Sequence, residues 1–258
     1  MNCFGRNLAR CCDIELMGYG FKKKSGGLYV RVVNDVVQTF KIEKLQSGRV
    51  CRGLFSVLPL CLRLDTGRAL GIAYSRELHK FEITPGLQMV GGWEFDLQSE
   101  ESINACIVEI VRFIKCYLVP LFERANCCQT GLAEIVALDK LFDENRIASL
   151  QQLGVKDLAV PDAGFNLLDR SKYYMAIKNG DYDYANECQT ALLNQNINAF
   201  EKRQHYDFLT PEKLDADRLE IQMLKDELKR IEARDVEYFR QLIDENEAYS
   251  RETLKDYL

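Results

Sequence analysis

The chain of 258 residues has only two histidines, His79 and His205, and no apolar run long enough to cross a membrane. A membrane-spanning helix needs about 18 consecutive apolar residues, and the N-terminal segment alternates polar and apolar types where a secretory signal needs an apolar core. The cysteines and histidines also lack the spacing of metal ligands. The sequence therefore predicts a cytoplasmic protein with no metal ion, cofactor or membrane segment.

Cysteine, in contrast, is abundant, with ten residues in the chain. Disulfide scaffolds are typically small secreted chains, whereas this one has 47% hydrophobic residues and can bury a core without covalent links. The adjacent pairs Cys11–Cys12 and Cys127–Cys128 lack the intervening residues of a zinc knuckle. We expect reduced thiols that pack as small apolar side chains.

The net charge of −5 is divided unequally along the chain. Residues 1–124 hold 17 basic and 13 acidic side chains, a net of +4, and residues 125–258 hold 17 basic and 26 acidic ones, a net of −9. Such a division predicts either that the two halves dock on each other or that the acidic half faces a basic partner.

The first half has the pattern of an α+β domain, predicted over 1–124. It begins with a helix over 2–17 that Gly18 ends, followed by a β-hairpin whose strands, 28–33 and 36–42, meet at Asn34–Asp35. Further strands are expected over 53–64, where Pro59 favours an edge or a bulge, and over 69–74, 79–83 and 92–97. Connections this short require an antiparallel sheet. A helix capped by Ser99 follows, and Pro120 is expected to kink or end it.

The second half, 125–258, is predicted to be entirely helical. The segment 131–155 is expected to form one or two helices that Gly154 stops, and a loop over 155–168 leads to a helical hairpin broken at Asn179–Gly180. From Thr210–Pro211 onward the pattern predicts one long C-terminal helix, with a heptad seam that Asp235 interrupts. The chain is thus expected to be a monomer or a dimer through this helix, with packing inside the chain favoured.

Candidate sites for chemistry are few. The glycine- and lysine-rich stretch at 18–27 follows a helix and precedes a strand, the reverse of a phosphate-binding loop. Glu94 and Asp96 lie two apart on a predicted strand and share a face, as an acid–base pair would require, but such acids also suit the wet side of a sheet. An enzyme with a site on the sheet, using these carboxylates with His79 and Arg31, is the alternative that we retain.

Several short motifs resemble a known family. Gly20, Phe21, Lys22, Lys23, Tyr29, Arg31 and Gln38, then Trp93 with Glu94, and the segment YLVPLFE at 117–123, match the pattern of the bacterial domain of unknown function 4304. The resemblance covers about residues 5–124, and the run at 56–59 departs from it. It implies an α+β fold and a bacterial origin, and it carries over no catalytic residue.

We therefore expect a non-enzymatic binding or interaction protein, by analogy a toxin-neutralising protein or an adaptor. Its partner is expected to be another protein, since the strands lack the basic and aromatic pattern of nucleic-acid binding. The predicted binding residues on the sheet are Arg31, Trp93, Glu94 and Asp96. Those on the acidic half are Asp181, Tyr182, Asp183, Tyr184 and Glu187, where aromatic rings beside acids suit an interface with a basic partner.

Overall fold

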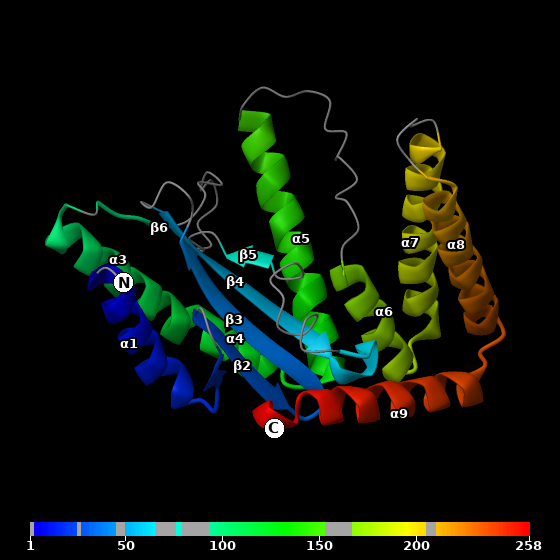
Figure 1. Ribbon diagram of the computed structural model, residues 1–258, viewed down its shortest axis with the longest axis horizontal. Coiled ribbons are helices and arrows are strands. Elements are labelled where there is room, and N and C mark those ends of the chain that lie inside the picture. Colours follow the sequence, from blue (N-terminus) through cyan, green and yellow to red (C-terminus); the bar gives the residue numbers. More distant parts are fainter. Residues whose placement is uncertain are drawn as a thin grey trace.

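The structure is a computed structural model that describes residues 3–24, 27–44, 50–64, 76–78, 93–96, 98–152, 167–204 and 210–258. Within these residues, six strands form one antiparallel sheet (Figure 1). They are β1 (Lys22–Lys23), β2 (Leu28–Val33), β3 (Val36–Lys44), β4 (Val50–Pro59), β5 (Arg76–Leu78) and β6 (Trp93–Glu94). Their order is β1-β2-β3-β4-β5, and β6 also pairs with β4. The predicted antiparallel α+β fold is confirmed.

The β2–β3 hairpin forms where the sequence predicted it. Val33 pairs with Val36, and Asn34 in the turn has φ of +50°, a conformation that asparagine tolerates better than most residues. The third predicted strand begins earlier than expected, at Val50, and ends at Pro59. β4 lies inside the sheet rather than at its edge, but Pro59 lies outside the stretch that pairs with β5, so its missing N–H breaks none of the described ladder between those two strands.

The first face of the sheet is covered by α1 (Cys3–Met17) and α3 (Glu100–Phe113). The Ser99 hydroxyl caps α3 as predicted, accepting from the Ser102 amide at 3.1 Å. The predicted end of α1 at Gly18 is confirmed, since the helix runs to Met17, but the left-handed residue that turns the chain is Gly20. Gly20 has φ of +81°, and the Phe21 amide donates to the Leu16 carbonyl at 3.2 Å, because a left-handed residue must turn the chain to close this type of helix end.

The helix after Ser99 does not stop at Pro120. It widens into a π-helical turn, η4 (Ile114–Leu118), and then continues as α4 (Val119–Arg124). Proline has no N–H to donate to the carbonyl four residues earlier and its ring crowds that carbonyl. A local π turn accommodates the ring without ending the helix, so the predicted disturbance takes this form.

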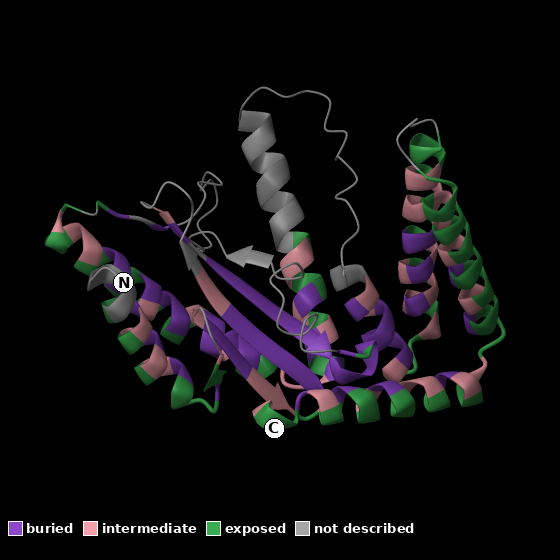
Figure 2. Cartoon of the chain, in the orientation of Figure 1, coloured by how far each residue is buried: buried purple, intermediate pink, exposed green. Residues whose placement is uncertain are grey.

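The second face of the sheet is covered by the helical half. Leu28, Val30, Val37 and Leu58 point to this face and form one apolar cluster with α6 (Leu167–Lys178), α9 (Val236–Thr253) and the short helix η2 (Leu60–Leu62). α5 (Cys128–Gln152) is a single helix beside β4 whose Cys128 and Ile135 join the apolar cluster of the first face, and a Cβ on Gly131 would lie 3.5 Å from Val57 Cγ1 of that cluster. In Figure 2 the buried residues follow the sheet and these neighbouring helices. The domain boundary near 125 stays a prediction, but apolar packing crosses it.

The break predicted at Asn179–Gly180 is confirmed. Gly180 has φ of +75° and ends α6, and the Asp181 carboxylate caps α7 (Tyr182–Arg203) by accepting from the Tyr184 amide at 3.0 Å. α8 (Pro211–Glu232) then packs antiparallel on α7 through Leu224, Leu192 and Leu193, so part of the predicted heptad seam is covered by the same chain.

The single C-terminal helix predicted from the sequence is wrong. It is two helices, α8 and α9, followed by the short η5 (Lys255–Tyr257). Arg234 adopts φ of +49° without the help of glycine, and Asp235 caps α9 by accepting from the Tyr238 amide at 3.2 Å. Burial of α9 against η2 and the second face stabilises this turn, which the local sequence does not require. The strands expected at 69–74 and 79–83, Gly154 and most of the loop at 155–168 lie outside the described residues.

Candidate functional site

An open groove of about 660 Å³ lies among α6, α8 and α9 in the helical half. α6 contributes Arg170 and Tyr174, α9 contributes Tyr238 and Leu242, and α8 forms the rest of the lining. This volume is within the range typical of ligand-binding clefts, roughly 300–1,000 Å³. The groove is therefore a candidate binding site.

The break between α8 and α9 shapes one end of this groove. The Arg230 guanidinium lies 4.1 Å from the centre of the Tyr238 ring, and its Nη1 donates to Asp235 Oδ2 at 2.9 Å. These contacts hold the start of α9 across the end of α8. Because α8 uses its seam to pack on α7, Leu219 and Met223 on another face of the helix remain 62% and 64% exposed. Large apolar side chains exposed beside a groove are typical of interaction surfaces.

Glu227 is the chemically distinctive residue of the groove. It is partly buried, and Gln189 Nε2 donates to its Oε2 at 2.7 Å. Burial raises the pKa of this carboxyl, and the positive charge of Arg170 and the hydrogen bond from Gln189 only partly oppose that effect. In the part of the chain that the structure describes, Glu227 forms no ion pair within 4.0 Å. The Glu227 carboxyl thus lines the groove without an ion-pair partner among the described residues.

The charge of Glu227 contributes to raised pKa values of two tyrosines of α6. Burial raises the pKa of Tyr174 to about 12, with the negative charge of Glu227 as the next cause. Burial and the same charge also raise the pKa of Tyr173, whose hydroxyl is buried with no hydrogen-bond partner of normal geometry among the described residues. Both phenols therefore stay neutral at physiological pH.

The groove is lined by apolar side chains together with three carboxyl groups, those of Glu220, Asp226 and Glu227, and two arginines, Arg170 and Arg230. Its described lining contains no serine, cysteine or histidine that could act as a nucleophile or a general base. Over the described residues no group of three or more histidine, cysteine or acidic side chains is placed to hold a metal ion. The arrangement can hold an apolar group that carries a positive charge.

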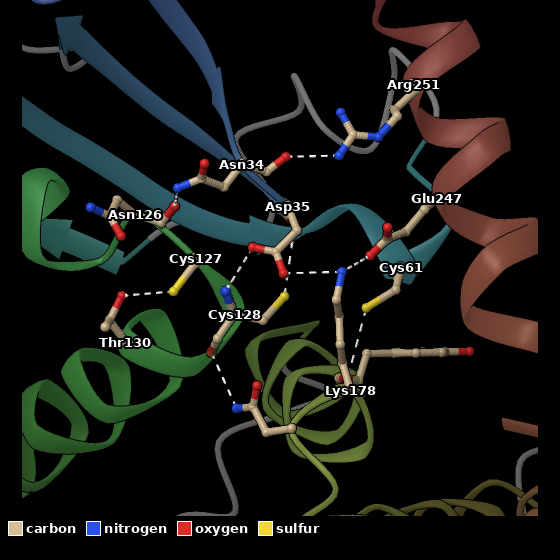
Figure 3. Close-up of polar contacts among 12 residues, drawn as sticks. Asn34, Asp35, Cys61, Asn126, Cys127, Cys128, Thr130, Lys178, Glu247 and Arg251 are labelled. Carbon is tan, nitrogen blue, oxygen red and sulfur yellow. Dashed lines mark hydrogen bonds and ion pairs between the residues drawn. The ribbon is translucent and has the colours of Figure 1, made fainter. Parts of the chain in front are cut away.

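A second polar cluster lies where the β2–β3 turn meets three helices (Figure 3). Lys178 of α6 forms ion pairs with Asp35 of the turn, at 3.0 Å, and with Glu247 of α9. The Cys128 amide at the start of α5 donates to Asp35 Oδ1 at 2.9 Å, and Arg251 Nη2 donates to the Asn34 carbonyl at 2.8 Å. Because these charges already meet one another, we assign the cluster to holding the turn, α5, α6 and α9 together.

The cysteines beside this cluster are thiols, as are all nine cysteines whose side chains the structure describes. Hydrogen bonding to Cys61 and burial both raise the pKa of Cys128. A hydrogen bond with Thr130 lowers the pKa of the neighbouring Cys127, which is partly exposed. The expectation of reduced cysteines agrees with these side chains.

Arg31, a predicted binding residue, is a structural junction. Its side chain is 12% exposed and lies over the Phe21 ring, its Nε donates to Gln38 Oε1 at 2.8 Å, and its Nη1 pairs with Glu123 Oε1 at 2.8 Å. Gln38 in turn donates to the Phe122 carbonyl at 2.7 Å. Phe21 and Gln38, which carry the family resemblance, therefore both contact Arg31. These contacts link the segment after α1 with β2, β3 and α4.

The other predicted sheet residues do not gather with Arg31. Trp93 is buried with its ring centre 5.5 Å from that of Phe113, and Asp96 is exposed and accepts from the Gln98 amide at 2.9 Å. The Glu94 side chain and His79 lie outside what the structure describes. The described contacts of Arg31 and Asp96 share no residue, so these side chains do not form one catalytic site.

The predicted acidic surface lies at the α6–α7 turn. Asp181 is a helix cap, and Asp183, which is 88% exposed, pairs with Arg234 of the α8–α9 turn at 3.2 Å. Of the aromatic residues, Tyr182 packs on Phe239 with ring centres 5.9 Å apart, and Tyr184 is partly buried, so that its pKa rises to about 12. Glu187 is exposed. The sequence singled out this turn but missed the groove, whose local signal was Leu219 and Met223 spaced four residues apart outside the heptad seam.

The described residues form an α+β protein whose helical half contains a groove, and comparison with known proteins identifies no relative. Neither the family models, the curated proteins nor the solved structures include a match to the chain. None of the described helices is long and apolar enough to cross a membrane.

Proposed function

We propose that this chain is a non-enzymatic binding protein that holds a segment of another protein in the groove among α6, α8 and α9. The observation that carries the proposal is the pair Leu219 and Met223, exposed at 62% and 64% on the rim of a groove of about 660 Å³. Exposing such side chains to water is unfavourable by roughly 1.5–3 kcal/mol each relative to burial, so a partner that covers them would gain affinity.

The charge of the helical half supports a basic partner. Its net charge of −9 favours encounter with a basic protein surface, and Asp183 and Glu187 are exposed beside the groove-forming helices. Asp181 is left out of this surface because it caps α7. In this proposal the exposed acids speed encounter and the apolar groove supplies most of the lasting contact.

The proposed origin, cellular location, activity and oligomeric state of the protein are inferred from the sequence. The resemblance to the bacterial domain of unknown function 4304 supports a bacterial origin, and the free thiols suit the reducing cytoplasm. Toxin neutralisation and an adaptor role are the two activities that fit an acidic binding surface on such a protein. The chain acts as a monomer or as a dimer through its C-terminal helices.

Replacing Leu219 and Met223 together by aspartate tests the proposal. The immobilised variant should lose a protein that the wild type captures from an extract of the native host, because two charges would enter the apolar rim. Val108→Asp is the matched control, since Val108 is 64% exposed on α3, away from the groove. Both variants should keep the wild-type thermal midpoint within about 2 °C. Identical capture by the wild type and the double variant would refute the proposal.

A further inference from the structure

We infer that the groove holds a lysine side chain of the partner protein, with the lysine ammonium group on the Glu227 carboxylate and its alkyl chain between the apolar walls. This inference rests on the proposed function and names the chemistry that the groove selects. Three features support it: the charges within the groove, the lack of an ion-pair partner for Glu227 among the described residues, and the surrounding apolar side chains.

Two of the five charged side chains that line the groove have ion-pair partners outside its lining. Arg230 pairs with Asp235 at 2.9 Å, and Asp226 pairs with Lys229 at 2.7 Å. Glu227 has no ion-pair partner among the described residues, and Arg170 acts on it only through a longer-range charge interaction. A partly buried carboxylate without a counter-ion is unfavourable, and an incoming cation removes this penalty.

The groups that face Glu227 come from every neighbouring helix. α6 presents Arg170 and the phenols of Tyr173 and Tyr174, α7 presents the Gln189 amide, and α9 presents the Tyr238 ring. Arg170 is the one cation in this set, both phenols of α6 are neutral, and hydrogen bonding from Tyr173, like that from Gln189, acts to lower the pKa of the Glu227 carboxyl. The immediate surroundings of the carboxylate thus combine polar groups with aromatic rings, a setting in which an ammonium group is well stabilised.

The geometry favours an ammonium group over a guanidinium group. Arginine binds carboxylates most strongly through two parallel hydrogen bonds, but Gln189 already donates to Oε2 at 2.7 Å, so the second bond would compete with it. An ammonium group is a point charge that needs only one accessible oxygen. Leu224 and Leu242 provide apolar surface along the groove for the methylene chain of lysine.

The experiment uses the full chain labelled with ¹³C at the methionine methyl groups. Met223 lines the groove and Met175 is fully buried elsewhere, so the first reports binding and the second reports general structural change. The probes are n-hexylammonium, which mimics a lysine side chain, and 1-hexanol, its neutral counterpart. We expect the Met223 signal to shift with hexylammonium at a concentration about tenfold lower than with hexanol.

Three variants then test whether Glu227 causes the preference for hexylammonium over hexanol. Glu227→Gln keeps the shape and should bind both probes equally, whereas Glu101→Gln, which changes an exposed acid in the first turn of α3, should keep the tenfold preference. Arg170→Gln removes the competing cation and should tighten hexylammonium binding about threefold, which tests the inference even if Glu227→Gln fails to fold. A preference that survives Glu227→Gln, or no change in Arg170→Gln, would overturn the inference.

A final comparison separates a protein partner from a small amine. The peptides acetyl-Leu-Lys-Leu-amide and acetyl-Leu-norleucine-Leu-amide differ only in the charged group, and the first should bind more tightly to the wild type. If only free hexylammonium shows the preference, the groove takes a small amine and the inference of a lysine from a protein is wrong. If no probe shifts Met223 at all, the proposed function fails with its groove, whereas equal binding of charged and neutral probes overturns only the lysine inference.

Discussion

Replacing Lys178 by methionine should destabilise the protein far more than loss of an ordinary surface charge. Lys178 is 24% exposed and joins Asp35 to Glu247, each 19% exposed, so its removal leaves two partly buried carboxylates facing one another. Breaking a buried ion pair by removing one partner costs about 3–5 kcal/mol, and the partial exposure here places the loss near the lower limit, about 3 kcal/mol. For a chain of this size such a loss lowers the thermal midpoint by about 6–12 °C.

The pH dependence follows from the two pKa shifts. Burial opposes ionisation of Asp35, but hydrogen bonds from Lys178 and the Cys128 amide prevail and lower its pKa. A lowered carboxyl pKa contributes stability that is present above the unfolded value of about 4 and is lost as the pH falls through the folded value. Burial likewise opposes the charge of Lys178, but its bonds to Glu247 and Asp35 raise its pKa, which adds stability below the unfolded value of about 10.4.

The difference in the free energy of unfolding between wild type and Lys178→Met should therefore be constant between about pH 5 and pH 9. It should shrink below about pH 4, where protonation removes the repulsion between the two carboxylates of the variant. Urea unfolding at a series of pH values measures both effects. Lys255→Met is the control, because Lys255 forms an exposed pair with Glu252, and the loss of such a pair should barely change the free energy of unfolding.

A double-mutant cycle with Asp35→Asn separates the ion pair from general packing. The side-chain carbonyl of the introduced asparagine can still accept from the Cys128 amide, so the cycle reports chiefly the interaction with Lys178. We expect a coupling energy of at least about 1 kcal/mol. A coupling below about 0.5 kcal/mol, or a Lys178→Met loss that matches the Lys255→Met loss, would refute the assignment of this cluster as a stabilising junction.

Changes at four further positions test two turns, at Arg234 and Gly180, the α7 cap at Asp181 and the packing of β4 at Gly53. Arg234→Gly should raise the free energy of unfolding by about 0.5–1 kcal/mol, because Arg234 has φ of +49° and glycine adopts this conformation without strain. Gly180→Ala should lower the free energy of unfolding by about 1 kcal/mol, because Gly180 has φ of +75°. A urea titration in which both variants changed stability in the same direction would contradict the turn geometry. Asp181→Ala should cost about 1 kcal/mol through loss of the α7 cap, and Asp181→Asn should cost clearly less in the same assay, with equal losses counting against the cap. Gly53→Ala should cost about 1–3 kcal/mol, since the new methyl group would come within 3.2 Å of the ring of Trp93, and the emission of this single tryptophan should change with it.

The sequence by itself determined the features whose causes lie within a few residues. Asn34 permits the hairpin turn, the Ser99 hydroxyl reaches an amide three residues on, and Gly180 ends a helix because it adopts positive φ without strain. The antiparallel arrangement followed in the same way, since short connections leave no room for crossover helices. The α+β fold and most helix positions were predictable for this reason.

Only the tertiary structure decided where the helical half would lie and what it would bring together. The turn at Arg234 contains no glycine from which it could be predicted. It forms because packing of α9 against the sheet stabilises an unfavourable backbone conformation. Asn246 of α9 donates to the carbonyl of Cys61, 185 residues away, and no local pattern encodes such a contact. The groove around Glu227 arises in the same way, because its walls come from three helices and its charge became distinctive only when burial removed the carboxylate from water.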